Sequence, residues 1–133
     1  MAVGATTGAR PLKVLVVEDN IINQRLAIGL LKQLGHTGVV VADGEKALRA
    51  LAALRFDAVL LDVMMPVMDG MQTLLAIRLE EVKTGKHLPV IMATAHDDPA
   101  DRRRFVNAGA DGYLIKPLAL ESLQDEIRRL LLL

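Results

Sequence analysis

The chain has 133 residues, which is enough for one domain with a sizeable buried core. Its 16 basic and 16 acidic side chains cancel, so the global charge does not favour nucleic acid or an anionic membrane as a direct partner. The absence of cysteine excludes a disulfide framework and thiolate chemistry, and no apolar run is long enough to span a bilayer.

Short apolar runs alternate with helical patterns along most of the chain. In chain order, the pattern predicts a strand at 13–17, a helix at 21–34, a strand at 38–42, a helix at 44–54, a strand at 58–61, a helix at 69–81, a strand at 89–93, a helix at 99–108, a strand at 113–115 and a helix at 120–132. The small and polar residues 1–11 are expected to form a flexible lead or linker, and residues 12–133 one domain.

Capping residues mark several of the expected helix ends. Asp43 and Asp98 are good N-caps, and Pro99 occupies the first helical position after Asp98, where proline is favoured. Gly109 is a typical stop signal for the helix that precedes it. Ala119 stands where the last helix needs a cap, and alanine caps poorly, so that helix is expected to begin without side-chain support.

Five strands that alternate with five helices imply right-handed crossovers and a parallel sheet covered on both faces. The expected fold class is therefore α/β, a flavodoxin-like, doubly wound (βα)5 domain. In such a sheet, sites form outside the carboxyl ends of the strands, close to the point where the strand order reverses.

Reactive or hydrogen-bonding side chains follow four of the expected strands at this edge. They are Glu18 with Asp19, then Asp62, then Thr94 and then Lys116. Three carboxylates in one crevice repel each other unless a cation lies among them, and all-oxygen ligands suit a hard ion such as Mg²⁺. The alternative is that each acid caps a neighbouring loop or helix, while the threonine is an ordinary β-branched strand residue and the lysine is solvated at a strand end.

The chain resembles the receiver domain of two-component response regulators over roughly residues 12–131. The resemblance rests on four segments in a fixed order, which are residues 14–20, 61–70, 93–95 and 108–117. Within that family, the Glu18-Asp19-Asn20 start and the methionine-rich loop after Asp62 are most similar to receivers of hybrid sensor histidine kinases.

The resemblance implies that Asp62 is the phosphoacceptor of a phosphorelay. It implies Mg²⁺, or Mn²⁺ in its place, bound directly by Asp19 and Asp62, through water by Glu18, and by the backbone carbonyl of Met64. Lys116 would pair with one phosphoryl oxygen.

The same resemblance implies that Thr94 would donate its hydroxyl to another phosphoryl oxygen. Thr94 and Tyr113 would form a switch that alters the face of the fourth helix, fifth strand and fifth helix. Pro117 would follow a cis peptide bond, for which an X–Pro bond is the accessible place. Residues 102–104 are a run of arginines on this face, and they are either a solvated surface or a partner surface.

The expected partner is a histidine kinase or a histidine phosphotransfer protein, with a kinase or output domain in a longer protein; the residues do not indicate an oligomeric state. We expect a cytoplasmic location, either free or tethered to a membrane sensor kinase. The domain would catalyse only its own phosphorylation and dephosphorylation and would not be an enzyme with an independent substrate.

Three other functions are compatible with parts of the pattern. An Mg²⁺-dependent phosphohydrolase with an aspartyl nucleophile commonly has a second acid two residues later, but that position is Met64. A nucleotide- or flavin-binding module is disfavoured because the first loop is acidic and lacks glycine. A degenerate receiver that serves only as an interaction module is disfavoured because every expected reactive residue is present.

Overall fold

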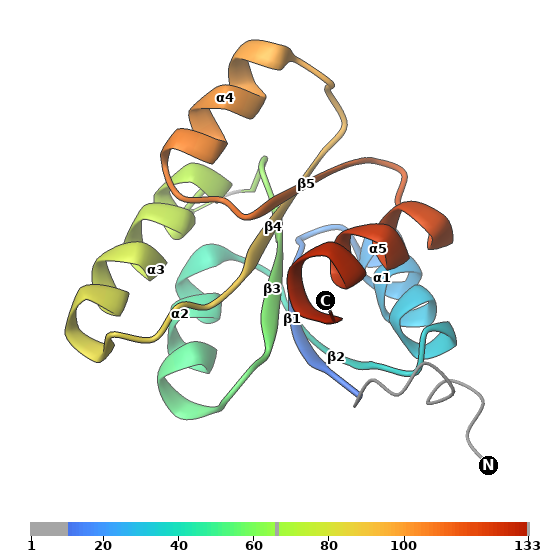
Figure 1. The fold of residues 1–133 in the computed structure, drawn as a ribbon, viewed down its shortest axis with the longest axis horizontal. Coiled ribbons are helices and arrows are strands. Elements are labelled where there is room, and N and C mark those ends of the chain that lie inside the picture. Colours follow the sequence, from blue (N-terminus) through green and yellow to red (C-terminus); the bar gives the residue numbers. More distant parts are fainter. Residues whose placement is uncertain (1–10, 66, 133) are drawn as a thin grey trace.

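The computed structural model describes residues 11–65 and 67–132 (Figure 1). Residues 1–10 of the expected lead or linker therefore lie outside the described residues. None of the helices in the described part of the chain is both long enough and apolar enough to cross a membrane.

The described chain folds around a single parallel sheet of five strands, in the order β2-β1-β3-β4-β5. The strands are β1 Lys13–Val17, β2 Thr37–Val41, β3 Ala58–Asp62, β4 Val90–Thr94 and β5 Gly112–Ile115. This is the strand order of the flavodoxin-like doubly wound fold, which confirms the expected fold class. Because β1 pairs with both β2 and β3, the order reverses at β1, next to the carboxyl ends of β1 and β3.

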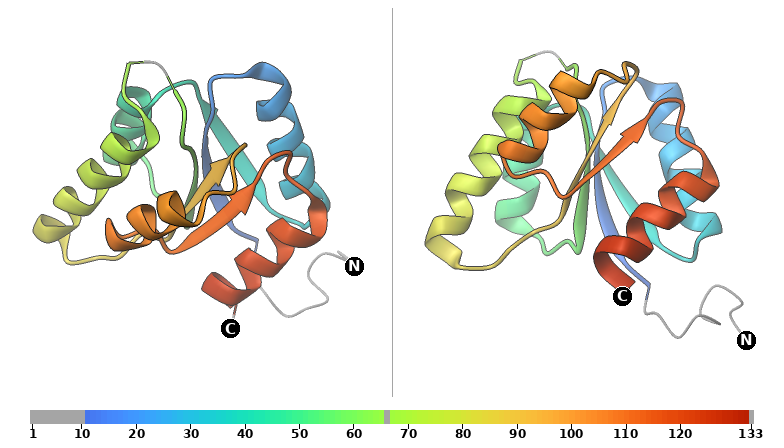
Figure 2. Two further views of the ribbon diagram at one scale, coloured as in Figure 1. Left: turned by 90° about the horizontal axis from the view of Figure 1, so that it is seen from above. Right: turned by 45° about the horizontal axis from the view of Figure 1, so that its top comes forward.

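Helices cover both faces of the sheet (Figure 2). They are α1 Ile21–Gln33, α2 Gly44–Ala53, α3 Gly70–Thr84, α4 Pro99–Asn107 and α5 Leu120–Ile127, and a π-helical segment, η2 Arg128–Leu132, continues α5. Helices α1 and α5 pack on one face, and α2, α3 and α4 pack on the other.

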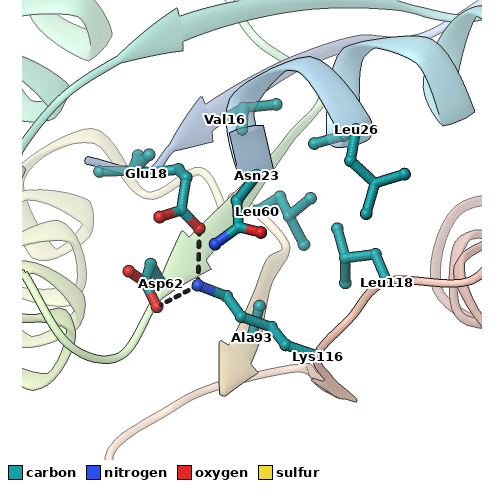
Figure 3. Close-up of a pocket in the computed structure, with 11 residues that line it drawn as sticks. Val16, Glu18, Asn23, Leu26, Leu60, Asp62, Ala93, Lys116 and Leu118 are labelled. Carbon is teal, nitrogen blue, oxygen red and sulfur yellow. Dashed lines mark hydrogen bonds and ion pairs between the residues drawn. The ribbon is translucent and has the colours of Figure 1, made fainter. Parts of the chain in front are cut away.

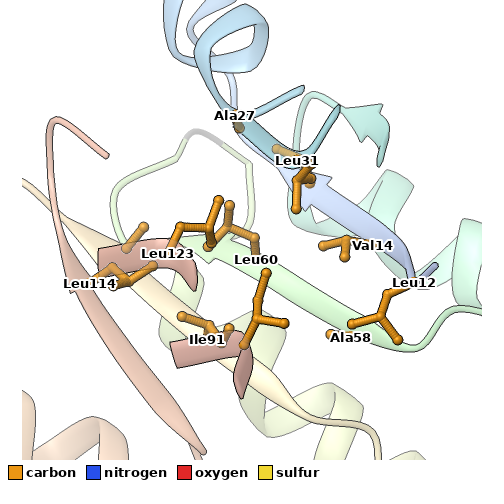
Figure 4. Close-up of a cluster of buried hydrophobic side chains, with 12 residues drawn as sticks. Leu12, Val14, Ala27, Leu31, Ala58, Leu60, Ile91, Leu114 and Leu123 are labelled. Carbon is orange, nitrogen blue, oxygen red and sulfur yellow. The ribbon is translucent and has the colours of Figure 1, made fainter. Parts of the chain in front are cut away.

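Two aliphatic clusters, one on each face, hold the helices against the sheet. The first contains Leu60 and Leu114 from the sheet, with Leu31 of α1 and Leu123 of α5 (Figure 4). The second joins Leu61 to side chains of α2, α3 and α4. Each fully buried leucine contributes about 1.5–3 kcal/mol by leaving water, so this double-sided burial makes the sheet a rigid support for residues at its edge.

The helix and strand ends deviate from the sequence prediction at several positions. The capping box of Asp69 and Gln72 begins α3, which runs three residues past the predicted end to Thr84 and stops at Gly85, whose φ of 70° is left-handed. The predicted last helix does span residues 120–132, but beyond Ile127 its hydrogen bonding changes from α-helical to π-helical. The Ala119 prediction is confirmed, because α5 begins without a side-chain cap.

Candidate functional site

Asp62 is the last residue of β3 and is buried, with 6% of its surface exposed. Glu18 directly follows β1 and is equally buried, because β1 and β3 are neighbours and end at the same level of the sheet. The structure therefore brings together two carboxylates that are 44 residues apart in the sequence. Burial without compensation would be costly for both groups, so their partners define the site.

Lys116 provides the compensating charge. Its ammonium donates to Glu18 Oε1 at 2.6 Å and to Asp62 Oδ1 at 2.8 Å (Figure 3). The lysine follows β5, and its side chain crosses the end of β4 to reach β3 and β1. The Lys116–Pro117 peptide bond is cis, the isomer that the resemblance to receiver domains implied.

These contacts affect the ionisation of Glu18 and Lys116 in different ways. Burial raises the pKa of the Glu18 carboxyl, although its hydrogen bond with Lys116 opposes this effect. Burial alone would lower the pKa of Lys116, but the two hydrogen-bonded carboxylates outweigh it and the pKa of the ammonium is raised. The lysine therefore stays charged, while the glutamate carries an electrostatic cost that a further cation would relieve.

Asp19 adds a third carboxylate and is exposed to solvent. Oxygen atoms of Glu18, Asp19 and Asp62 all lie within 4.8 Å of one another. Three hard oxygen donors with one open, solvated side match what Mg²⁺ requires, because this ion keeps several waters and binds few carboxylates. The donor set therefore fits a divalent cation, and these residues could hold one.

Met64 is exposed in the loop after β3, and its N–H donates to Asp62 Oδ1 at 3.4 Å. The loop thus turns back over the carboxylate. The role of the Met64 carbonyl as a metal ligand stays a prediction.

Thr94 ends β4 and is buried. It lies one residue beyond Ala93, the register partner of Asp62, so it borders the same edge of the sheet. Its hydroxyl oxygen accepts from the His96 N–H at 3.2 Å, and its carbonyl accepts from the Lys116 N–H at 2.7 Å. The hydroxyl proton is therefore available for another acceptor at this edge.

Tyr113 lies on β5, outside the carboxylate cluster, and is half-buried. The Arg102 guanidinium sits over its ring at 4.6 Å from the centroid, and the Phe105 ring lies 6.3 Å away, both from α4. Its hydroxyl donates to the His96 carbonyl at 3.4 Å. Burial raises the pKa of the phenol, and the charge of Arg102 opposes that shift. The ring thus contacts α4 and the segment that follows Thr94.

A small pocket opens beside this cluster, between α1 and the segment after β5 (Figure 3). Glu18, Asp62 and Lys116 line it together with aliphatic side chains and Asn23, which sequence reasoning missed. A signal existed, since Asn23 stands one helical turn after the capping Asn20, where a residue faces the end of the strand that precedes the helix.

Comparisons with known proteins agree with this geometry. The family model that describes the response regulator receiver domain matches residues 14–128 of the chain. The receiver domain of the sensor histidine kinase PA1611 from Pseudomonas aeruginosa PAO1, solved with a magnesium ion coordinated in its active site cleft, superposes with a TM-score of 0.80 and 37% identity, covering 90% of this chain and 97% of that one.

Two curated relatives represent different kinds of full-length protein. The Response regulator MprA of Mycolicibacterium vanbaalenii is 40% identical over 91% of this chain and 51% of its own length. The Hybrid signal transduction histidine kinase I of Dictyostelium discoideum is 36% identical over 88% of this chain but only 7% of its own length. The chain thus spans about half or less of these relatives, and it belongs to the response regulator receiver domain family.

Proposed function

We propose that this domain accepts a phosphoryl group on Asp62 from a phosphohistidine and changes its surface in response. The observation that carries this proposal is the position of Asp62 between Lys116, at 2.8 Å, and two further carboxylates. A buried carboxylate with an adjacent cation on one side and open oxygen donors on the other is suited to receive a phosphoryl group.

The free oxygen of Asp62 is the proposed nucleophile. Oδ1 accepts from Lys116, whereas Oδ2 accepts no hydrogen bond from residues 11–65 or 67–132. A P–O bond would form at the carboxylate as the P–N bond to the donor imidazole breaks, and the electron pair of that bond returns to the imidazole nitrogen. Lys116 would then move from Asp62 to a phosphoryl oxygen, with the Thr94 hydroxyl donating to a second one.

We propose Mg²⁺ as the cofactor, with Glu18, Asp19, Asp62 and the Met64 carbonyl as the residues that would hold it or its waters. When bound, the ion supplies positive charge that offsets the repulsion between the carboxylates and the incoming phosphoryl oxygens. The raised pKa of Glu18 supports this assignment, because burial disfavours its charged form and the charge of Asp62 adds to that cost, which a bound cation would relieve.

The proposed readout passes through Thr94 to Tyr113. Movement of the Thr94 hydroxyl toward a phosphoryl oxygen would remove the hydrogen bond from His96, whose carbonyl also holds the Tyr113 hydroxyl. The α4-β5-α5 face would then change around that ring. The proposed partners are a histidine kinase or histidine phosphotransfer protein, with a kinase or output domain in a longer protein, and the domain turns over no separate substrate.

The test is phosphorylation with a small phosphodonor such as acetyl phosphate in the presence of Mg²⁺. We expect one hydroxylamine-labile phosphoryl group per chain, which is lost in Asp62→Asn and absent when a chelator removes the metal. Equal labelling of Asp62→Asn would contradict the nucleophile assignment, and undiminished labelling in chelator would contradict the metal role. A Thr37→Ala variant, changed at the opposite edge of the sheet, should be labelled like the wild type.

A further inference from the structure

Asn23 is the third residue of α1, where a side chain is often used to cap the helix. Here the cap is made by Asn20, whose Oδ1 accepts from the Asn23 N–H at 3.0 Å. The reciprocal half of a capping box is not needed, because the Asn20 N–H already donates to Glu18 Oε2 at 3.1 Å. Asparagine is also a weaker helix former than alanine. Neither capping nor helix propensity therefore accounts for this side chain.

The side chain of Asn23 points into the pocket, toward the ion pair of Glu18 and Lys116 (Figure 3). Among the residues that line the pocket it supplies the one uncharged polar side chain, and the others are aliphatic or belong to the charged cluster. The pocket has a volume of about 10 Å³, which is room for about one water molecule. The carboxamide is thus within reach of the cluster directly or through one water.

The hydrogen-bonding capacities of Lys116 and Asn23 are complementary. An ammonium has three N–H donors, and Lys116 uses two of them on Glu18 and Asp62. The Asn23 carboxamide makes no hydrogen bond with the residues that the structure describes, although its backbone N–H is used. The half-buried carboxamide therefore faces a half-buried ammonium that has one donor left; its nitrogen is the nearer end in Figure 3, and turning the amide by 180° brings its oxygen to the same place.

We propose that Asn23 is a positioning residue for Lys116: its carboxamide oxygen accepts the third N–H of the ammonium, directly or through one water. The consequence rests on the proposed function. When Asp62 carries a phosphoryl group, Lys116 must exchange one carboxylate contact for a phosphoryl contact. A third partner on α1 keeps the flexible lysine at the site during that exchange, so less conformational entropy is lost at the moment of transfer.

The first experiment follows the Lys116 ammonium directly, by NMR of ¹⁵N-labelled lysine side chains in metal-free protein. We expect a wild-type signal that exchanges slowly with water. Asn23→Leu, which keeps the shape and removes the acceptor, should make exchange at least several-fold faster. Asn23→Asp retains an oxygen acceptor and is compatible with the first turn of a helix, so it should keep the slow exchange. Equal exchange in wild type and Asn23→Leu would overturn the proposal, as would fast exchange in Asn23→Asp.

The second experiment measures the rate of labelling by acetyl phosphate with Mg²⁺. We expect Asn23→Leu to be labelled roughly tenfold more slowly, the loss expected for one hydrogen bond to a charged group. The matched control is Asn107→Leu, the same substitution at an exposed position of α4, which should behave like the wild type. Slower labelling of Asn23→Leu with unchanged Lys116 exchange would overturn the assignment to Lys116.

The two readouts separate the two proposals. If the wild type takes no phosphoryl group, the proposed function fails, whereas the exchange measurement in metal-free protein still decides whether Asn23 holds Lys116. A thermal unfolding midpoint within a few degrees of wild type establishes that each variant is folded.

Discussion

The two edges of the sheet both contain charged side chains that are at least partly buried, but the charges are paired differently. At the carboxyl edge, one ammonium bonds to two of three clustered carboxylates, and one oxygen of Asp62 is left without a donor from the described chain. At the amino edge of β4 and β5, every N–H-bearing nitrogen of the Arg78 guanidinium has an acceptor. The carboxyl edge therefore has an unused oxygen acceptor, whereas each donor nitrogen of Arg78 at the amino edge is already hydrogen-bonded.

The amino edge is a network centred on Arg78 of α3. Its guanidinium donates to the carbonyls of Gly109 and Leu88 and to the carboxylates of Glu81 and Asp111, at 2.6–2.9 Å. The two carboxylates also accept backbone N–H groups at the start of β4, and Asp111 lies 2.7 Å from His87 Nε2. The network therefore ties α3 to the loops that lead into β4 and β5.

Removing Arg78 is the strongest test of this difference between the two edges. We expect Arg78→Leu to lower the free energy of unfolding by about 3 kcal/mol or more, because two half-buried carboxylates lose their cation. Chemical denaturation measures the change. Arg49→Leu, which removes a solvent-exposed pair with Glu45, should cost less than about 0.5 kcal/mol. A similar cost for the two variants would remove the distinction between a structural network and a surface ion pair.

The corresponding change at the carboxyl edge should be much milder. Asp62→Asn is expected to alter the free energy of unfolding by less than about 1 kcal/mol in metal-free buffer. Lys116 keeps Glu18, the new amide oxygen still accepts, and the repulsion between Glu18 and Asp62 is removed. Mg²⁺ should raise the midpoint of thermal unfolding of the wild type and raise that of the variant less. A loss as large as that of Arg78→Leu would mean that this edge, too, is built for stability.

A buried histidine makes a further polar contact at the amino ends of β1 and β2. His36 is buried, and its Nδ1 accepts from the Leu12 N–H at 3.0 Å. Burial lowers the pKa of this imidazole from its ordinary value of 6.5, and the nearby charge of Asp57 opposes the shift only in part.

The lowered pKa of His36 predicts how the free energy of unfolding depends on pH. Above pH 6.5 both states are neutral at His36; as the pH falls from there toward the folded-state pKa, only the unfolded chain takes up the proton. Stability should fall over this window by at most about 1.4 kcal/mol per pH unit. His36→Asn keeps an acceptor for the Leu12 N–H but does not titrate. Between pH 8 and pH 5, the free energy of unfolding should therefore fall more in the wild type than in this variant. If the free energy of unfolding depended on pH in the same way in both proteins, the prediction for His36 would be contradicted.

The smallest expected effect concerns Tyr113, which is the only tyrosine in a chain without tryptophan. Arg102→Ala should raise the pKa of the phenol further, because the guanidinium over its ring lowers that pKa. The cost in stability should be within the roughly 0.5–1 kcal/mol of an exposed cation–π contact. Phenolate absorbance during a pH titration measures the shift. Arg103→Ala, its exposed neighbour, is the control, and an equal shift there would show that general positive charge is responsible.

The difference between the edges also explains what could be read from the sequence. Glu18, Asp19, Asp62, Thr94 and Lys116 each directly follow or end an apolar run, and parallel strands bring such positions together. The partners of Arg78 lie in loops and at helix ends between 3 and 33 positions away, without a periodic pattern. His36 was missed for the same reason, because its surroundings come from a segment elsewhere in the chain, and the helical spacing of Asn23 gives its distance from Asn20 but not its approach to Lys116.

By itself, the sequence determined the alternation of strands and helices, the parallel sheet and the set of residues at its carboxyl edge. It could do so because hydrophobic period and strand order are local and topological properties. Only the tertiary structure decided that Lys116 bridges Glu18 and Asp62, that Arg102 covers Tyr113 and that Asn23 faces the ammonium. Those contacts depend on side-chain direction and packing between distant segments, which no spacing along the chain encodes.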